Sequence, residues 1–147
     1  MEQMIIGRKE RADLPDFGLR NIQVKIDSGA YSCSVDCRSA HIVTIDGIEQ
    51  LEVIFLSEER KEFSGEVYHF KNFLSKKVTS STGNSQIRYF ITGRITLFGT
   101  EFTTLFSLSK RSGMKTPVLI GRKLLNNNFI IDTSKMNLSR KSKKKSG

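Results

Sequence analysis

The chain has 147 residues, of which 37% are apolar, and this is the size and composition of a single globular domain. Lysine and arginine total 24 against 15 acidic residues, so the net charge is +9 and favours an anionic partner such as nucleic acid, an acidic peptide or anionic lipid. A charged fraction of 27% with 10 phenylalanines excludes intrinsic disorder, and the presence of only 2 prolines excludes a collagen-like or linker composition.

The apolar runs and the cysteines indicate the compartment. The start of the chain carries an acid at Glu2 and becomes polar at Gly7, unlike a secretory signal peptide. No apolar run approaches the ~20 residues that span a bilayer. Cys33 and Cys37 are the only cysteines, too few for a disulfide framework, and they suit a reducing compartment. We therefore expect a cytoplasmic protein without a membrane partner.

Short apolar runs that alternate with polar residues predict β-strands along most of the chain. In chain order, these runs are residues 22–26, 42–45, 51–55, 87–91 and 95–98. Turn-forming residues lie between β-like runs, and the two turns that are flanked by extended runs of similar length predict hairpins. The three turns are Asp46-Gly47, Thr82-Gly83-Asn84 and Phe98-Gly99-Thr100. The sequence thus predicts an all-β fold.

Two segments have helical character. Residues 32–40 allow a short helical turn. A clearer helix begins near Gly121 and ends at residues 126–128, because asparagine tolerates the left-handed conformation that closes a helix. From Ser139 onward the chain is too charged to pack against a core. We therefore divide the chain into a folded domain, 1–138, and a disordered basic tail, 139–147.

The most specific local pattern is an extended run that leads into Asp27, Ser28, Gly29 and Ala30. A strand fixes the direction of the carboxylate, and glycine permits a tight turn whose backbone amides approach it. Ser28 places a hydroxyl beside the carboxylate. By itself, an Asp-Ser-Gly sequence is most often only a turn.

A second apolar run, residues 117–120, leads through Gly121 and Arg122 into the predicted helix. Together, the Asp-Ser-Gly-Ala and Gly-Arg-Lys-Leu-Leu patterns resemble those of the retroviral-type aspartic proteases. The resemblance implies a small closed β-barrel with one short C-terminal helix, one lobe per chain. Since the chain carries a single such motif, the resemblance also implies a homodimer in which two Asp27 carboxyls meet.

This resemblance assigns the chemistry to Asp27. Two like charges close together cannot both ionise cheaply, so one carboxyl of the pair keeps a proton. The ionised carboxyl takes a proton from the attacking water, and the protonated one hydrogen-bonds the amide carbonyl. Ser28 is then expected to hydrogen-bond across the interface, and the Gly29 N–H to face the carboxylate. No metal and no cofactor are implied.

A longer pattern covers nearly the whole chain. It consists of residues 6–10, 13–15, 18–19, 25–30, 80–83, 111–115, 117–122 and 131–132. This pattern resembles that of the bacterial and archaeal RimB family, which also carries the label ATP-dependent zinc protease and whose members accompany RimK-type glutamate ligases. The resemblance implies a cytoplasmic peptidase that trims the α-linked polyglutamate that the ligase makes or adds to a ribosomal protein.

Polyglutamate is a polyanion, so cationic side chains would steer and hold it. Arg88 follows the 80–83 turn, and Arg111, Lys115 and Arg122 lie on either side of the second apolar run. These four residues are our candidates for substrate contacts. For Arg122 the resemblance also implies an alternative role, in which it forms a structural ion pair at the dimer interface.

The chain departs from the family pattern after the Asp-Ser-Gly motif, where Tyr31 replaces an arginine and Asp36 replaces a histidine. Residues 56–77 also match poorly, and we expect them to shape the flap or the dimer edge differently. These departures concern substrate preference more than fold. They also leave open the alternative that this chain keeps the fold of the family but has lost its activity.

Other groupings support alternative hypotheses. Cys33, Cys37 and His41 are spaced four apart, which on a helix would place three metal ligands on one face, but a fourth ligand is lacking. Asp132 has no following glycine, and we interpret it as a turn residue.

The alternative function is a non-catalytic basic module that binds RNA or the ribosome through surface lysines and the tail from Arg140 to Lys145.

Overall fold

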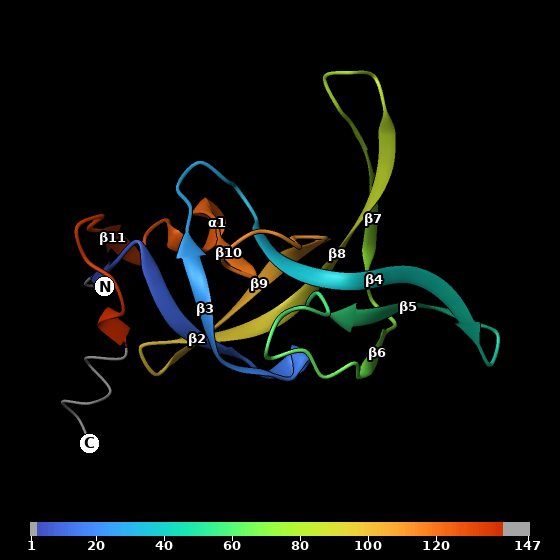
Figure 1. Cartoon of the computed structure of the whole chain (residues 1–147), viewed down its shortest axis with the longest axis horizontal. Helices are drawn as coiled ribbons and strands as arrows, with labels where there is room; N and C mark the ends of the chain where they lie inside the picture. The colour runs from blue at the N-terminus through green and yellow to red at the C-terminus, as the bar shows by residue number, and fades with distance from the viewer. Residues whose placement is uncertain (1–2, 140–147) are drawn as a thin grey trace.

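The computed structural model describes residues 3–139, and it has an all-β fold with one short α-helix (Figure 1). Six strands close into a barrel, because each is hydrogen-bonded to two neighbours around a ring. The predicted closed β-barrel is therefore confirmed. In ring order the strands are β2 (Lys9–Leu14), β3 (Leu19–Ile26), β10 (Val118–Ile120), β4 (Cys33–Ile45), β9 (Thr100–Ser109) and β8 (Ser85–Leu97), which pairs back with β2.

The barrel forms because its strands alternate in polarity, so that one face of each fills the interior. β2 shows this pattern most regularly, with buried and partly exposed positions in strict alternation. Phe17, in the 3-10 turn η1 (Pro15–Phe17), lies in the core with its ring 4.6 Å from the Phe55 ring and 5.3 Å from the Phe106 ring. Gly93 leaves room for Phe17, since a Cβ at this position would lie 2.4 Å from the ring.

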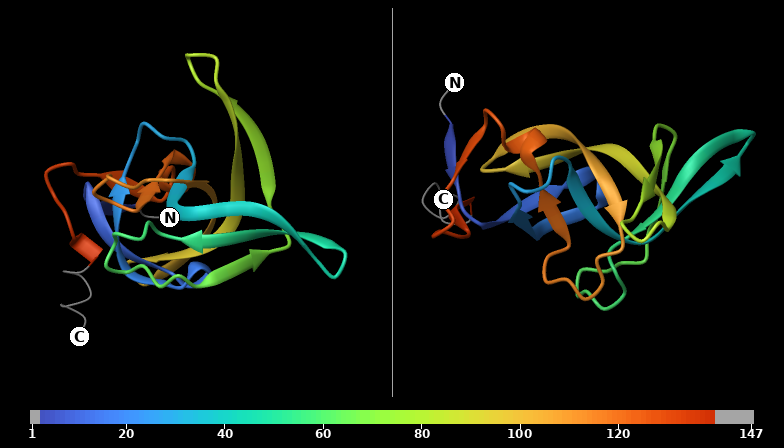
Figure 2. Two further views of the ribbon diagram at one scale, coloured as in Figure 1. Left: turned by 45° about the vertical axis from the view of Figure 1, so that its right-hand side comes forward. Right: turned by 90° about the horizontal axis from the view of Figure 1, so that it is seen from above.

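Two strands are longer than the barrel and extend out of it (Figure 2). β4 and β8 have 13 residues each. β4 forms a hairpin with β5 (Ile48–Phe55), and β6 (Val67–Phe70) adds to the far side of β5. β8 pairs with β7 (Leu74–Thr79) in a hairpin that projects away from the barrel. The barrel therefore carries two β-extensions on different sides.

All three predicted turns are present, and each of them joins the two strands of a hairpin. Asp46 and Gly47 join β4 to β5 with φ values of 51° and 78°. Phe98 and Gly99 join β8 to β9 with φ values of 53° and 74°, and Gly83 turns the β7–β8 hairpin with φ 87°. Positive φ at the turn matches the right-handed twist of the flanking strands, which explains the glycines.

The helix prediction is right in position but too long. α1 covers Arg122–Leu125 only, because Asn126 leaves the helical conformation and Asn127 is left-handed with φ 68°. The helical turn predicted for residues 32–40 is wrong, since β4 occupies this segment. Cys33, Val35 and Cys37 lie two residues apart in the hydrophobic core, as on one face of a strand, and Asp36 on the other face is also buried.

The two ends of the described chain lie close together. β1 (Met4–Ile6) pairs in parallel with β11 (Phe129–Ile131) in a separate two-stranded sheet. Ser139, the first residue of the predicted tail, is part of the fold, because its N–H and its hydroxyl each donate to the buried Glu10 at 2.8 Å. The rest of the tail, 140–147, lies outside the described residues. Within 3–139, no helix has the length and apolar character needed to cross a membrane.

Candidate active site

The Asp27 carboxylate lies at the end of the barrel where the chain leaves β3. β10 runs parallel to β3 with Ile120 beside Ile26, and the Asp27 N–H donates to the Ile120 carbonyl at 2.9 Å. The chain then turns tightly, with the Ala30 N–H donating to the Asp27 carbonyl at 3.2 Å. Inside this turn the Gly29 N–H donates to Asp27 Oδ1 at 3.0 Å. A backbone dipole therefore holds the carboxylate in one orientation.

The second sequence motif packs directly against this turn. The Arg122 N–H donates to the Ala30 carbonyl at 2.8 Å. Only glycine fits at position 121, the residue before Arg122, because a Cβ there would lie 2.5 Å from the Ser32 carbonyl oxygen. The two motifs, which are far apart in the sequence, thus form one structural unit.

The Arg122 side chain braces the turn from outside. Its Nη1 donates to the Ser28 carbonyl at 2.9 Å, and its guanidinium lies 5.9 Å from the centre of the Tyr31 ring. Tyr31 is 60% exposed, Ser28 and Gly29 are exposed, and Asp27 is half-buried. The carboxylate is therefore accessible to a substrate or to a second copy of the chain.

The four predicted substrate cations do not gather at one point. Arg122 lies at the Asp27 turn. Lys115 is exposed on the loop that precedes β10, and Arg88 is half-buried on β8 in the projecting hairpin. Arg111 is only 8% exposed, and its Nε donates to the Thr116 carbonyl at 3.1 Å. The structure thus places one of the four beside Asp27.

Arg111 is nevertheless linked electrostatically to the site. Burial lowers the pKa of Arg111, and the positive charge of Arg60 lowers it further. The carboxylates of Asp36 and Asp27 oppose this shift. Both aspartates therefore act on the same guanidinium.

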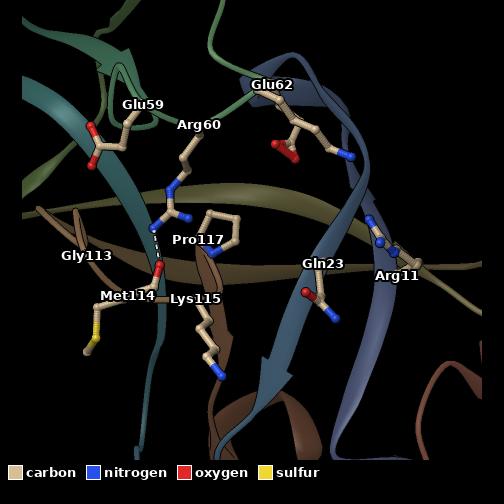
Figure 3. Close-up of a pocket in the computed structure, with 10 residues that line it drawn as sticks. Arg11, Gln23, Glu59, Arg60, Glu62, Gly113, Met114, Lys115 and Pro117 are labelled. Carbon is tan, nitrogen blue, oxygen red and sulfur yellow. Dashed lines mark hydrogen bonds between the residues drawn. The ribbon is translucent and has the colours of Figure 1, made fainter.

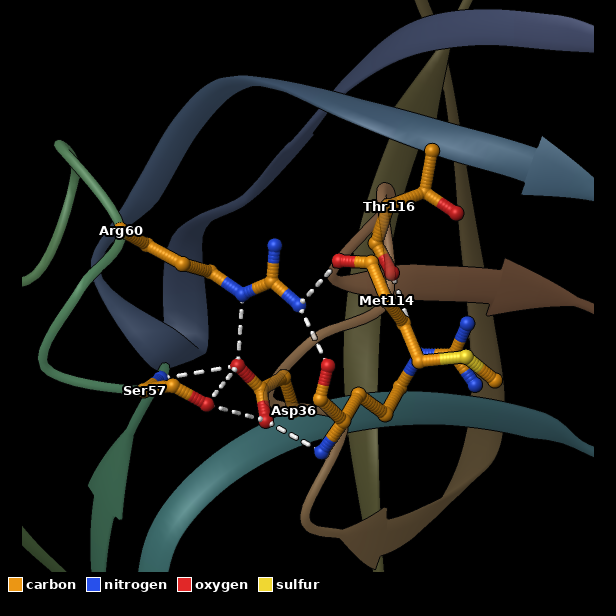
Figure 4. A network of polar contacts seen from close by, with 6 residues as sticks. Asp36, Ser57, Arg60, Met114 and Thr116 are labelled. Carbon is orange, nitrogen blue, oxygen red and sulfur yellow. Dashed lines mark hydrogen bonds and ion pairs between the residues drawn. The ribbon is translucent and has the colours of Figure 1, made fainter.

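A second aspartate, Asp36 on β4, forms a buried network that the sequence analysis did not identify (Figure 4). Ser57 donates to it through its N–H at 2.8 Å and its hydroxyl at 2.7 Å. Arg60 Nε donates at 2.6 Å and the Arg111 N–H at 2.7 Å. Burial alone would raise the pKa of the Asp36 carboxyl, but these donors outweigh it and hold the pKa below its ordinary value.

Arg60 extends this network to the loop before β10. Its Nη2 donates to the carbonyls of Arg111 at 2.9 Å and Met114 at 3.0 Å. Asp36 and Arg60 together therefore fasten two loops to the barrel. The only sequence signals for this role were the histidine that Asp36 replaces and the poor match of residues 56–77 to the family pattern.

The cysteines and histidines do not assemble a metal site within residues 3–139. Cys33 and Cys37 are buried free thiols, and burial raises the pKa of Cys37 to about 11. His41 lies instead beside Glu52, with Nε2 at 2.9 Å from a carboxylate oxygen, and His69 Nε2 lies 3.1 Å from the other oxygen. The helical spacing considered for Cys33, Cys37 and His41 fails because a strand separates residues four apart by about 13 Å.

Asp132 is a turn residue, in agreement with its interpretation from the sequence. It follows β11, and its Oδ1 accepts the Ser134 N–H at 3.0 Å. Its side chain is thus engaged in a local turn of the kind that aspartate commonly forms.

A closed six-stranded barrel, an Asp-Ser-Gly turn at the end of one strand and a Gly-Arg helix start packed against that turn define a retropepsin-like lobe. The chain belongs to the RimB-like family, because the family profile described as "Retropepsin-like aspartic endopeptidase RimB" matches residues 5–142. The predicted family is therefore confirmed, and it supports a peptidase-like role.

Curated relatives carry another name. The chain is 28% identical over 137 residues to a "Probable alpha-L-glutamate ligase" of Shewanella pealeana, a match that covers 90% of this chain and 29% of that protein. A protein of the same name from Desulfotalea psychrophila is 29% identical over 131 residues, or 87% of this chain and 28% of that protein. The chain thus spans less than a third of the length of these relatives.

A solved structure has the same fold. It is the crystal structure of a protein of unknown function from Legionella pneumophila, with a TM-score of 0.66 and 22% sequence identity. The similarity covers 94% of this chain and 99% of that one. At this identity the likeness establishes the fold alone.

Proposed function

We propose that the chain is an aspartic peptidase in which the Asp27 carboxyls of two copies form the catalytic pair, and that it hydrolyses α-linked polyglutamate or glutamate-rich peptide tails. The observation that carries this proposal is the Asp27 turn, where the Gly29 N–H orients a half-buried, accessible carboxylate in a chain of the RimB-like family. One turn per chain supplies one carboxyl, so a second copy supplies the other.

The β1–β11 sheet supports association with a second copy. It has only two strands within the described chain, so each strand has one edge without a strand partner. Met4, Ile5 and Ile130 are 41%, 46% and 50% exposed, and Ile5 lies in register with Ile130. Unpaired strand edges and clustered apolar side chains both favour pairing with another chain.

In the proposed reaction, one Asp27 carboxylate takes a proton from water as the water oxygen bonds to the amide carbon. The protonated Asp27 carboxyl of the other copy donates to the carbonyl oxygen. The tetrahedral intermediate then breaks at the C–N bond, and a proton passes to the leaving nitrogen. Gly29 holds the carboxylate through these steps, and the exposed Ser28 hydroxyl would link the two turns.

Cationic side chains support an acidic substrate. We retain Arg88, Lys115 and Arg122 as candidate contacts, and we assign the buried Arg111 to holding the loop that carries Lys115, since it is bound to the Thr116 carbonyl. The name of the glutamate ligase relatives supports a link to a glutamate ligase. We propose that this ligase is of the RimK type, and that its ribosomal protein is the source of the substrate. We place the activity in the cytoplasm, where free thiols persist.

The test compares the wild type with Asp27→Asn on α-linked polyglutamate from acidic to neutral pH, with and without a chelator. Mass spectrometry follows the products, and analytical ultracentrifugation follows the dimer. We expect the wild type alone to shorten the polymer, regardless of chelator. Hydrolysis by both proteins, or an intact polymer with both proteins folded and dimeric, would contradict the proposal.

A second candidate function is a non-catalytic module that binds RNA or the ribosome, and the β7–β8 hairpin favours it. The chain has no acidic residue between Glu66 and Glu101, while Lys76, Lys77 and Arg88 lie on the paired strands of this hairpin. Contacts of this kind with phosphates make affinity fall steeply with salt.

RNA binding that is lost in a Lys76→Gln/Lys77→Gln variant but kept in Asp27→Asn would favour this second function. The tail that was predicted to share the role lies outside the described residues, and deletion of the chain after Ser139 tests it separately. Polyglutamate hydrolysis that survives both the Lys76→Gln/Lys77→Gln change and the deletion after Ser139 would favour the peptidase.

A further inference from the structure

A pocket of about 440 Å³ lies on the outside of the barrel, between the loop after β5, the loop before β10 and the strands β2 and β3 (Figure 3). We name it the basic pocket. Arg11 and Gln23 line it from the strands, and Arg60 and Lys115 line it from the loops. Sites for small ligands commonly have volumes of roughly 300–1,000 Å³, so the pocket can hold a side chain of a bound peptide.

Arg60 is the fixed element of the basic pocket. Its side chain is 11% exposed, with Nε on the Asp36 carboxylate and Nη2 on two backbone carbonyls. Nη1 has no partner among the described residues, and in Figure 3 it is turned toward Pro117 on the pocket side. A guanidinium that is already held in place loses little freedom when it binds an anion.

The charges around the basic pocket favour an anion. Two acidic residues, Glu59 and Glu62, also line the pocket. The Asp36 carboxylate pairs with the positive charge of Arg60 on the side away from the pocket, but it is fully buried and out of reach of a ligand. The lining cations are Arg11, Arg60, Lys61 and Lys115.

We propose that the basic pocket binds a carboxylate side chain of an acidic peptide. A single concave site with a fixed guanidinium and a neighbouring amide, Gln23, suits one planar carboxylate. A nucleic-acid backbone would instead call for a continuous cationic stripe, which Glu59 and Glu62 interrupt.

The distance to the candidate active site fits the same peptide. Gln23 precedes Asp27 on the β3 segment by about 13 Å of extended chain, at ~3.3 Å per residue. An extended substrate that is cut at Asp27 and runs alongside β3 toward Gln23 would place a side chain about four residues from the cut bond in the basic pocket. This link to cleavage rests on the proposed function, whereas anion binding by the pocket can be measured without it.

Binding is tested with the Asp27→Asn protein, which removes turnover. Hexaglutamate and the neutral hexaglutamine are titrated separately, and amide chemical shifts are recorded by NMR. We expect hexaglutamate to shift the amides of Gln23, Gly113 and Met114, and hexaglutamine to leave them in place. Shifts with neither peptide, or equal shifts with both, would overturn the proposal.

Matched charge changes locate the binding. Lys115→Gln is expected to weaken hexaglutamate binding about fivefold, and Glu62→Gln to strengthen it about twofold. Lys76→Gln makes the same charge change on the β7–β8 hairpin, outside the pocket, and is expected to change affinity less than about twofold. Equal weakening by Lys115→Gln and Lys76→Gln would mean general charge attraction and would overturn the proposal.

The failure of this proposal and the failure of the proposed function are distinguishable. Pocket shifts with hexaglutamate but no cleavage by the wild type would leave the basic pocket standing and remove the peptidase. Cleavage with an unchanged KM in Lys115→Gln would remove the pocket and keep the peptidase. An RNA oligonucleotide that shifts these amides while hexaglutamate does not would also overturn the proposal. In the expected case, Lys115→Gln raises KM for hexaglutamate but not for diglutamate, which is too short to reach the pocket.

Discussion

Asp27 and Asp36 lie on either side of the turn between β3 and β4, yet their surroundings are opposite. Asp27 is half-buried and receives the Gly29 N–H, whereas Asp36 is fully buried and receives hydrogen bonds from three residues on two loops. A carboxylate whose lone pairs are occupied holds structure, and one with free lone pairs can take a proton. The same residue type thus serves two different purposes in adjoining segments.

The largest effect that the proposed function predicts is the loss of activity on substitution of Asp27, the half-buried but accessible aspartate. Asp27→Asn should lower polyglutamate hydrolysis about 10⁴-fold, because the amide cannot act as the base, by analogy with other catalytic-residue losses. The free energy of unfolding should change by less than about 1 kcal/mol, since the residue is accessible and few contacts are lost. Initial rates and urea unfolding of the same preparations measure both quantities.

The buried aspartate should show the reverse. Asp36→Asn is expected to lower the free energy of unfolding by about 3 kcal/mol, because it leaves the Arg60 guanidinium without its counter-charge in the interior. Urea unfolding measures this free energy for Asp36→Asn and for Asp27→Asn side by side, so that the same chemical change is compared at the two positions. Equal destabilisation of the two variants would refute the distinction drawn between the two aspartates.

Gly121→Ala should damage both stability and activity, because it acts on the contact between the two motifs. The new Cβ would lie 2.5 Å from the Ser32 carbonyl oxygen, and relieving this overlap should cost about 2 kcal/mol. It would also push the Asp27 turn away from α1. Lys123→Ala, an exposed neighbour, is the control and should behave as the wild type in unfolding and hydrolysis assays.

The network of Asp36 should also appear in the pH dependence of stability. The pKa of Asp36 is lowered in the folded state, so its contribution is fully present above the unfolded pKa of about 4 and is lost as pH falls through the folded pKa. The difference in unfolding free energy between wild type and Asp36→Asn should therefore shrink from pH 7 to pH 3. A difference that stays constant over this range would contradict the assignment.

The smallest effect should come from an exposed pair. Asp16 accepts from Arg94 through Nη2 at 2.6 Å and Nε at 3.1 Å, with 30% and 48% of the two side chains exposed. Asp16→Asn should cost about 0.5 kcal/mol, and this cost should fall in high salt. Urea unfolding at low and high salt checks both points, and Asp36→Asn should show little salt dependence by comparison.

Much of the fold could be predicted because its signals are local. Alternating polarity predicted parts of β3, β4, β5 and β8, but β2, β6, β7 and β9 were not predicted from it. Asp46-Gly47 and Phe98-Gly99 predicted turns that need positive φ. The error at residues 32–40 arose where short apolar spacing fits a helix and a strand equally well. The excess length given to α1 arose because three asparagines in a row do not show which one ends the helix.

Local patterns in the sequence were enough to predict several strands, the turns between them, the Asp27 turn and the family, since each depends on neighbouring residues or on a motif that lies along the chain. Tertiary structure alone decided that Asp36 meets Ser57, Arg60 and Arg111, and that Arg60 stands beside Lys115 in the basic pocket. Hydrogen bonds and ion pairs act over a few ångströms, and only closure of the barrel brings these distant segments within that range.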